Sequence, residues 1–452
     1  MTHKEWIGLL ALIVLLSRLP FLNAGYGNDP DAWQMANAAR SIATTGEYTA
    51  SRLPGYPLPE IIYSLIGLHN PIFFNVITAT LSAIAFSLFI LILWQVHARH
   101  YLLAGLTLAF CPVIFINSTN AMDYVWALTF ILASTYLVLT KRTLGAAMCL
   151  GLAIGCRITS GAMLLPLSLM LVHAEGKIVV RSLLKFVVIA CLFGAICFVP
   201  VFLYYGPAFL AFIDRYPPLL WVVYSGSIGV WGTIGSCALL FMIVSQIWTM
   251  RRDGISVAQL NKSANKLLML AWLLTIGLYT VAFLRLPHDG AYLMPMIPFV
   301  ILVLDRFLSS KRFVIACVAI ILSSFFIHVE RTAVSFVGPI FADHQERIEK
   351  ITYTERYATA VEQLEHKSLI IAGQWLPALK ATLPQPFNPN VEPNIEIVNL
   401  PNEINIHAYL DRGFQVYYLA GQRQLTLELY QFDLANLGAL PLIQDENANV
   451  KW

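Results

Sequence analysis

The sequence predicts a polytopic α-helical membrane protein that ends in a small soluble α/β domain. Hydrophobic residues make up 58% of the 452 residues, charged residues only 12%, and the mean hydropathy is +0.67. Apolar runs of this length need lipid around them rather than a shared soluble core. Residues 1–329 hold 11 acidic and 20 Lys or Arg side chains, whereas residues 330–452 hold 15 acidic and 9 Lys or Arg side chains. We therefore expect a transmembrane domain over 1–329 and a differently solvated domain over 330–452.

The apolar runs predict the membrane-spanning helices. A helix rises roughly 1.5 Å per residue through a hydrocarbon layer about 30 Å thick, so each crossing needs about 20 apolar residues. The expected spans lie near residues 6–24, 72–96, 101–117, 121–140, 185–204, 219–248, 267–286, 290–308 and 312–329. The first run ends without a small-residue cleavage site, which predicts a retained anchor.

The run 143–173 is ambiguous, because its middle is rich in glycine and contains Arg157. With a cytoplasmic N-terminus, the Lys- and Arg-rich connections fall on the cytoplasmic side only if this run crosses twice or re-enters. We expect two short helices that meet near Arg157, which then lines a protein-covered cavity, and about 11 spans in total. The expected location is the cell (inner) membrane, with the C-terminal domain outside the cytoplasm.

The first outer loop, residues 25–70, carries the two most informative acids. Small and apolar residues repeat at helical spacing from Ala32 to Ala43, which predicts an amphipathic helix on the membrane surface with Asp29 and Asp31 at its N-terminus. A second surface helix is expected over 58–68. The two acids can cap the helix and complement its dipole. Alternatively, one of them takes a proton from a hydroxyl group while arginines bind a phosphate.

Further polar residues are expected at the same outer face. An ionisable side chain at a membrane edge is a candidate site residue by default. Asp123 begins a span. It can either stabilise the helix dipole or belong to the functional site, and the two roles are equal alternatives. The cationic candidates can bind a phosphate, pair with Asp123 or Asp289, or reach toward the interface. The expected set is Asp29, Asp31, Glu47, Glu60, Asp123, Asp214 and Asp289 with Arg18, Arg40, Arg52, Arg157, Arg215, Arg285 and His288.

The segment after residue 330 alternates helix and strand patterns, which predicts an α/β domain. Helices are expected over 343–366 and 402–412, and strands over 368–373, 395–399 and 414–420. Its glycine turns lack the spacing of a dinucleotide or phosphate loop, so we expect no nucleotide cofactor and no nucleic-acid partner.

Several motifs in residues 1–310 resemble those of one superfamily. An arginine late in the first span, an acidic motif in the first outer loop and an Arg-x-Pro-type turn occur in that order, followed by a broken hairpin and a late outer loop. Here they are Ser17-Arg18-Leu19-Pro20, Asn28-Asp29-Pro30-Asp31-Ala32-Trp33, Ser51-Arg52-Leu53-Pro54-Gly55-Tyr56-Pro57-Leu58, Gly151 to Arg157, and Arg285 to Pro298. The layout resembles the GT-C membrane glycosyltransferases, such as the protein O-mannosyltransferases and the lipid A aminoarabinose transferase.

This resemblance implies a GT-C-like fold and transfer of a sugar, with inversion, from a polyprenyl-phosphate carrier to a glycan, lipid or protein acceptor. It implies Asp29 as the catalytic base, with Asp31 as the alternative. A divalent metal, Mg²⁺ or Mn²⁺, held by Asp29 and Asp31 stays open. The residues that the resemblance and the outer-face argument assign to substrate binding are Arg18, Arg52, Tyr56, Asp123, Arg157, Arg285, His288 and Tyr292.

Two other functions compete with this one. A lipid-linked glycan ligase or polymerase would depend on arginine and histidine rather than on an aspartate pair. A transporter or permease would show broken helices in two related halves of the chain, and the sequence shows one break and no internal repeat.

Overall fold

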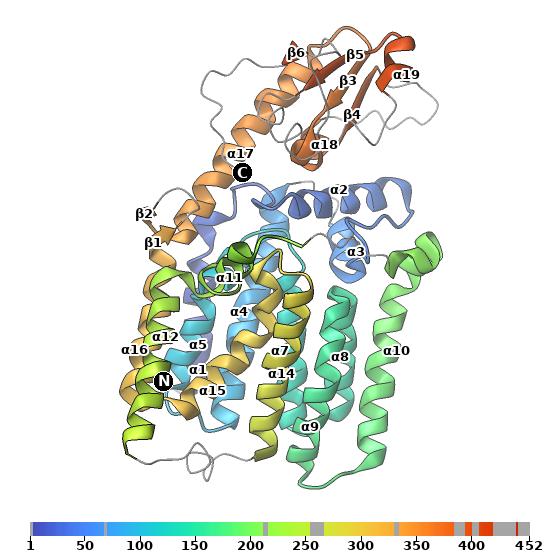
Figure 1. Ribbon diagram of the computed structural model, residues 1–452. Helices are drawn as coiled ribbons and strands as arrows, with labels where there is room; N and C mark the ends of the chain where they lie inside the picture. Colours follow the sequence, from blue (N-terminus) through green and yellow to red (C-terminus); the bar gives the residue numbers. More distant parts are fainter. Residues whose placement is uncertain are drawn as a thin grey trace.

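The computed structural model describes residues 3–66, 70–210, 216–253, 266–329, 334–383, 394–399, 406–418 and 440–441, most of which are helical (Figure 1). The first α-helices are α1 (His3–Leu16), α2 (Pro30–Thr45), α3 (Pro57–Leu65), α4 (Pro71–Gln95), α5 (Tyr101–Ala109), α6 (Pro112–Asn117), α7 (Tyr124–Leu139), α8 (Thr143–Cys156) and α9 (Leu164–Glu175). The next are α10 (Val180–Tyr205), α11 (Leu219–Gly226), α12 (Ile228–Arg252), α14 (Lys266–Arg285), α15 (Ile297–Phe307) and α16 (Ser310–Phe325). Between them lie the short 3₁₀ helices η1 (Leu19–Phe21), η2 (Ile158–Met163), η3 (Gly206–Leu210) and η4 (Gly290–Met296).

Six helical segments in the described part of the chain are long and apolar enough to cross a membrane. They are Pro71–Gln95, Ile158–Glu175, Val180–Leu210, Ile228–Arg252, Lys266–Arg285 and Gly290–Phe307. Helices α7 and α8 are apolar but shorter. These helices support a membrane-embedded, polytopic helical protein, while the count of about 11 spans and the orientation in the membrane stay predictions.

Several expected spans differ from the helices in the structure. The run 101–117 is two helices, because the chain breaks at Phe110 and Cys111 between α5 and α6. Helix α1 ends at Leu16, before the short η1 turn, rather than at residue 24. The run 219–248 is two helices, because the chain turns at Ser227 between α11 and α12. The last run becomes strand β1 (Phe326–Val329) after Phe325, and β1 pairs with β2 (Val334–Val337) in a hairpin across the expected domain boundary.

The expected break near Arg157 is present, but the glycines before it have another cause. Helix α8 ends at Cys156, and Arg157 is extended (φ −159°, ψ 114°) before η2 and α9. Gly151 and Gly155 lie within α8, where added Cβ atoms would meet Phe193 Cβ at 2.3 Å and Cys197 Sγ at 2.5 Å on α10. These glycines therefore allow close helix packing, as small residues do between membrane helices.

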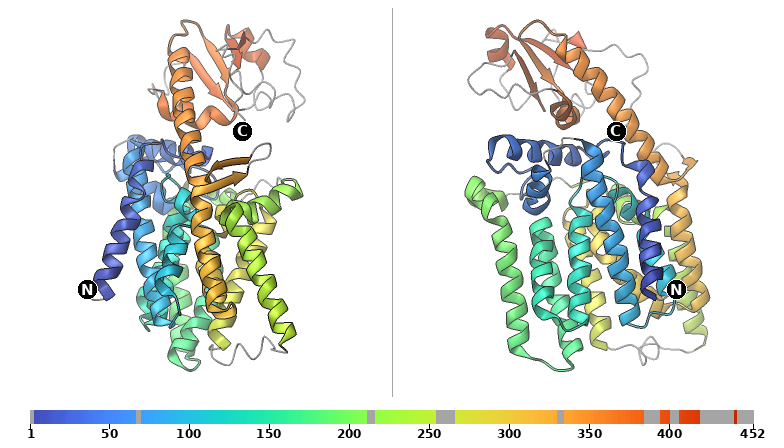
Figure 2. Two further views of the ribbon diagram at one scale, coloured as in Figure 1. Left: turned by 90° about the vertical axis from the view of Figure 1, so that its left-hand side faces the viewer. Right: turned by 180° about the vertical axis from the view of Figure 1, so that it is seen from behind.

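Helices α2 and α3 cross one end of the helical bundle and lie between it and the C-terminal sheet (Figures 1 and 2). The side chain of Asn37 donates a hydrogen bond to the Pro377 carbonyl at 2.8 Å, and Arg40 donates to the Ala381 carbonyl at 2.7 Å. Helix α2 is thus covered by the C-terminal part of the chain, where the sequence predicted a helix on a membrane surface. Gly46 ends α2 in the left-handed conformation (φ 72°), as expected.

The C-terminal part contains α17 (Pro339–Glu362), β3 (Ser368–Ile371), η5 (Gly373–Trp375), α18 (Leu376–Thr382), β4 (Ile395–Val398), α19 (Ile406–Asp411), β5 (Gln415–Tyr418) and β6 (Leu440–Pro441). Its strands pair in parallel in the order β4-β3-β5-β6, with β3 fully buried. Tyr357 and Val361 of α17 and Trp375 pack on this sheet through Ile370. Residues 402–405 of the expected helix 402–412 lie outside the described residues, as do Asp214 and Arg215. Whether this part is a separate soluble domain stays a prediction.

Candidate functional site

Asp29 and Asp31 lie at the end of a segment that we call the acid loop (residues 24–31). Asp29 is the N-cap of α2: its backbone is extended, and its Oδ1 accepts a hydrogen bond from the Asp31 N–H at 2.9 Å. Pro30 is the first helical residue, where the missing N–H leaves no helical bond unmade. The capping arrangement is therefore confirmed. It uses one carboxylate oxygen of Asp29, and the second oxygen has acceptor sites of its own.

The turn before α3 is organised by the buried side chain of Glu60. Glu60 Oε1 accepts hydrogen bonds from the N–H and the hydroxyl of Ser51 at 2.7 and 2.6 Å. Its Oε2 accepts from the Tyr48 hydroxyl and from the Tyr56 N–H. Four donors thus satisfy a carboxylate with no exposed surface. Because Arg52 lies between the donating residues, Glu60 fixes the turn that carries Arg52.

We expect Glu60→Gln to lower the free energy of unfolding by about 2 kcal/mol, because an NH₂ group would face two donors in place of an acceptor oxygen. Thermal unfolding of the purified protein in nanodiscs measures the change. Glu47→Gln is the matched control, since Glu47 is exposed in the same loop. A melting temperature of Glu60→Gln equal to that of the wild type would contradict this role.

Arg52 connects Asp31 to Asp123, and Asp123 in turn contacts Arg157. It forms an ion pair with Asp31, and its second guanidinium nitrogen lies 3.3 Å from Asp123 Oδ1. Asp123 Oδ2 accepts from Arg157 at 2.6 Å. Asp123 is fully buried, while the side chains of Arg52 and Arg157 are 18% and 11% exposed. We call Asp31, Arg52, Asp123 and Arg157 the ion network.

Tyrosine rings cover the faces of both guanidinium groups. The Arg157 guanidinium carbon lies 4.4 Å from the ring centre of Tyr124, 4.8 Å from that of Tyr292 and 5.6 Å from that of Tyr56. Arg52 lies 4.5 Å from the Tyr56 ring centre and donates from Nε to the Tyr56 hydroxyl at 2.7 Å. Cation–π contacts of this kind contribute on the order of 1 kcal/mol each. They also hold each guanidinium in one plane, with N–H groups directed toward the carboxylates.

Asp289 borders the same site. Its Oδ1 accepts from the Ala291 N–H at 2.9 Å, and its Oδ2 accepts from the Tyr124 hydroxyl at 3.1 Å. Burial raises the pKa of the Asp289 carboxyl, and the nearby charge of Asp29 raises it further. The sequence suggested Asp289 as an ion partner of arginine, whereas the structure gives it a tyrosine and a backbone amide.

Burial also raises the pKa of Asp31, from 3.8 to about 6, against the lowering effect of Arg52. The neighbouring carboxylates Asp29, Asp123 and Asp289 add to the rise. Because the pKa is higher in the folded state, ionisation of Asp31 weakens the fold as the pH rises from about 4 to 6. Above about pH 6 the carboxylate is charged and the ion pair with Arg52 is complete.

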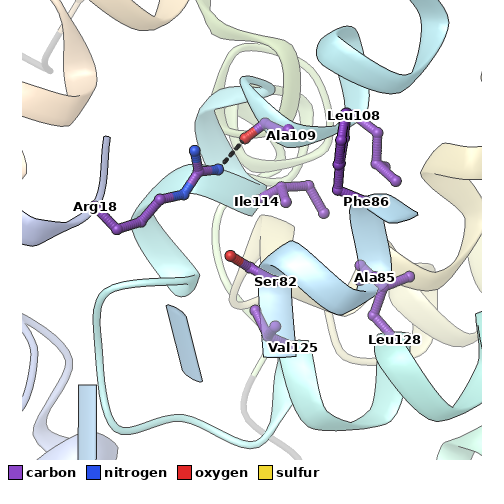
Figure 3. A pocket seen from close by; sticks show the side chains of 9 residues that line it. All are labelled: Arg18, Ser82, Ala85, Phe86, Leu108, Ala109, Ile114, Val125 and Leu128. Atoms are coloured by element: carbon purple, nitrogen blue, oxygen red, sulfur yellow. Dashed lines mark hydrogen bonds between the residues drawn. The ribbon is translucent and has the colours of Figure 1, made fainter. Parts of the chain in front are cut away.

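Arg18, expected among the substrate-binding residues, lies apart from the ion network. It is fully buried and donates hydrogen bonds to the carbonyls of Ala109 and Val14 and to the Ser118 hydroxyl. Figure 3 shows it beside a small cavity whose lining is otherwise mostly apolar. The lining residues are Arg18, Ser82, Ala85, Phe86, Leu108, Ala109, Ile114, Val125 and Leu128. Arg18 therefore satisfies the carbonyls where α1, α5 and α6 meet, while its expected role in substrate binding stays a prediction.

Arg285 and His288 precede Asp289 in the chain but are not joined to the ion network. The side chain of Arg285 is exposed at the end of α14, and no ion pair within the described segments includes it. The carbonyl of His288 accepts a hydrogen bond from the Trp221 indole at 2.9 Å. Of the expected substrate-binding set, the structure thus brings together Arg52, Tyr56, Asp123, Arg157 and Tyr292.

The arrangement of Asp29 and Asp31 fits a guanidinium better than a metal ion. Arg52 occupies the Asp31 carboxylate, and one oxygen of Asp29 accepts a backbone hydrogen bond. A divalent cation can also be held by one or two carboxylates together with waters, so a metal at Asp29 and Asp31 stays a prediction.

Comparisons with known proteins find no family model and no curated protein that matches the chain. Its function is therefore inferred from its own residues and their geometry. Two residues of the site region were not expected from the sequence: Tyr124 beside Arg157, and Lys350 of α17, which donates to the Asn28 carbonyl at 2.6 Å. Glu60 was expected at this face, but its hydrogen bonds within the turn before α3 were not. Tyr124 could have been found from its position next to Asp123, but Lys350 carries no local signal.

Proposed function

We propose that the protein is a membrane glycosyltransferase that moves a sugar from a polyprenyl-phosphate carrier to an acceptor hydroxyl group at the face of the membrane where α2 lies. In this proposal that face is extracytoplasmic, and the fold is of the GT-C type. The proposal rests on one observation above all: Asp31 of the acid loop pairs with Arg52, and Asp123 joins Arg52 to Arg157.

The chemistry needs a base and a group that stabilises a leaving phosphate. The acceptor oxygen attacks the anomeric carbon, the bond from that carbon to the phosphate oxygen breaks, and the electron pair leaves with the polyprenyl phosphate. Asp29 takes the hydroxyl proton through its second carboxylate oxygen. We assign the base to Asp29 rather than Asp31 because Asp31 is engaged with Arg52, whereas no arginine in the described part of the chain pairs with Asp29.

Arg52 and Arg157 serve the leaving phosphate. A guanidinium group can bind two phosphate oxygens at once, and such charge-assisted hydrogen bonds are about twice as strong as neutral ones. The tyrosine rings occupy the faces of these groups, so the N–H groups in the plane can turn from carboxylate to phosphate. Asp31 and Asp123 hold both arginines in position until the donor arrives.

The direct test uses membrane vesicles from cells that express the protein, supplied in parallel with radiolabelled polyprenyl-phosphate mannose and polyprenyl-phosphate glucose. We expect label from at least one donor to enter a lipid, glycan or protein fraction, with stoichiometric release of polyprenyl phosphate. Vesicles from cells without the protein are the control. No transfer from any polyprenyl-phosphate sugar, together with no binding of polyprenyl phosphate to the protein in nanodiscs, would remove the proposal.

A lipid-linked glycan ligase is the second candidate, because paired arginines faced by tyrosines would serve its lipid phosphate equally well. It needs no aspartate base, so the two candidates differ in their response to the loss of Asp29.

A further inference from the structure

Helix α17 reaches from the bundle to the C-terminal sheet, and its first half packs against the acid loop (Figures 1 and 2). Arg347 is 1% exposed and donates to the carbonyls of Ala24 at 3.0 Å, Gly25 at 3.3 Å and Thr119 at 2.6 Å. Buried backbone carbonyls in an irregular loop need such donors. A side chain more than 300 residues away therefore supplies part of the hydrogen bonds that the acid loop does not make within itself, and Asn75 supplies another, to the Gly25 carbonyl at 2.8 Å.

Lys350 extends this contact to the residue before Asp29. It is 2% exposed, and its ammonium group donates to the Asn28 carbonyl at 2.6 Å. Burial lowers the pKa of Lys350 to about 8, and the charges of Asp29 and Glu346 oppose that change. The ammonium group is thus within electrostatic reach of Asp29.

Apolar packing also contributes to the interface between α17 and the acid loop. Gly25 has φ +69°, and a Cβ added to it would lie 3.1 and 3.2 Å from side-chain carbons of Ile351. The acid loop is therefore pressed against α17 at Gly25, just as it is hydrogen-bonded to Arg347 and Lys350.

Charge gives the interface a role beyond packing. Four carboxylates, Asp29, Asp31, Asp123 and Asp289, interact electrostatically at the site, and the ion network contains only two arginines. Helix α17 brings both Lys350 and Glu346 to the acid loop, and Glu346 accepts a hydrogen bond from the Asn28 side chain. Lys350 places a positive charge within reach of Asp29 itself, where it weakens the local repulsion of an anionic phosphate donor.

We propose that α17 is part of the site and that Lys350 is a positioning residue for Asp29, which couples the C-terminal part of the chain to the acid loop. This inference deepens the proposed glycosyl transfer and rests on it. Its structural half, the dependence of the acid loop on Lys350, can be measured without any substrate.

The test compares Lys350→Met, which keeps the length of the side chain but removes its charge, with Lys350→Arg. Arg356→Met is the matched control, because Arg356 is an exposed cation on the same helix. We expect faster hydrogen–deuterium exchange in peptides that cover residues 22–34 of Lys350→Met. We also expect its maximal transfer rate to fall about tenfold or more, with little change in the donor concentration at half-maximal rate. Lys350→Arg should restore part of both.

Each outcome decides one question. Wild-type exchange and wild-type transfer in Lys350→Met would overturn the role of α17, and faster exchange with unchanged transfer would show that Lys350 is only structural. If Asp29→Asn transfers normally, the proposed function fails whatever Lys350 does. Should Lys350→Met not accumulate, Ile351→Ala trims the contact with Gly25 and keeps every charge. It should then show the same two changes at smaller size, and its failure to show them would overturn the inference.

Discussion

Asp29→Asn should lower transfer from polyprenyl-phosphate sugars by about 100- to 10,000-fold while leaving the stability of the protein nearly unchanged. The carboxamide has no basic oxygen that can take the acceptor proton. It can still cap α2, because asparagine and aspartate are about equally good N-cap residues. The transfer assay in vesicles measures the first effect, and thermal unfolding in nanodiscs measures the second.

Asp29→Ala separates the two roles of this residue. It loses the cap as well as the base, so its free energy of unfolding should fall by about 1 kcal/mol relative to Asp29→Asn, with no further loss of transfer. If Asp29→Asn kept wild-type transfer, Asp29 would be a cap only, and the lipid-linked ligase would become the better candidate. Asp31→Asn would then show whether Asp31 is the base.

Asp123→Asn should lower the free energy of unfolding by about 3 kcal/mol and abolish transfer as well. Asp123 is fully buried and compensates two arginines at once, at 3.3 and 2.6 Å. Removing one partner leaves the others buried without compensation, which typically costs 3–5 kcal/mol. We expect a cost at the lower end of this range, because both arginine side chains keep some exposed surface. Thermal or denaturant unfolding in nanodiscs gives the value.

Asp253→Asn is the control for Asp123→Asn. Asp253 pairs with Arg252 at 3.0 Å, but both side chains are exposed, and exposed pairs contribute about 0 to 1 kcal/mol. The double variant Asp123→Asn with Arg157→Met should lose less than the sum of the two single losses, because the two residues interact directly. Additive losses would argue against a shared ion network.

Local sequence signals predicted several elements closely. The Asp29–Pro30 start and the Gly46 end of α2 were readable because caps act over a few residues. The chain break at Arg157 was predicted, but Gly151 and Gly155 were assigned to it wrongly. Glycine is needed at these two positions because α10 packs closely against them. A glycine that permits close packing looks the same in sequence as one that interrupts a helix.

The candidate site was only partly predictable. The sequence selected Asp31, Arg52, Asp123 and Arg157 as charged residues of one membrane edge, but their order of pairing could not be read. Arg18 came from the same argument and turned out to be bonded to nearby carbonyls instead. A membrane-edge arginine can satisfy its donors with carboxylates or with backbone oxygens, and only the packing of α1 against α5 and α6 decides between them.

By itself, the sequence determined that this is a helical membrane protein with an α/β pattern at its end, because apolar length and helix caps act within one segment. The tertiary structure alone decided that Lys350 and Arg347 reach the acid loop, across more than 300 residues, and that Asp123 bridges two arginines. The physical reason is that hydrogen bonds and ion pairs depend on distances of about 3 Å. Such distances are set by how helices far apart in the chain pack together.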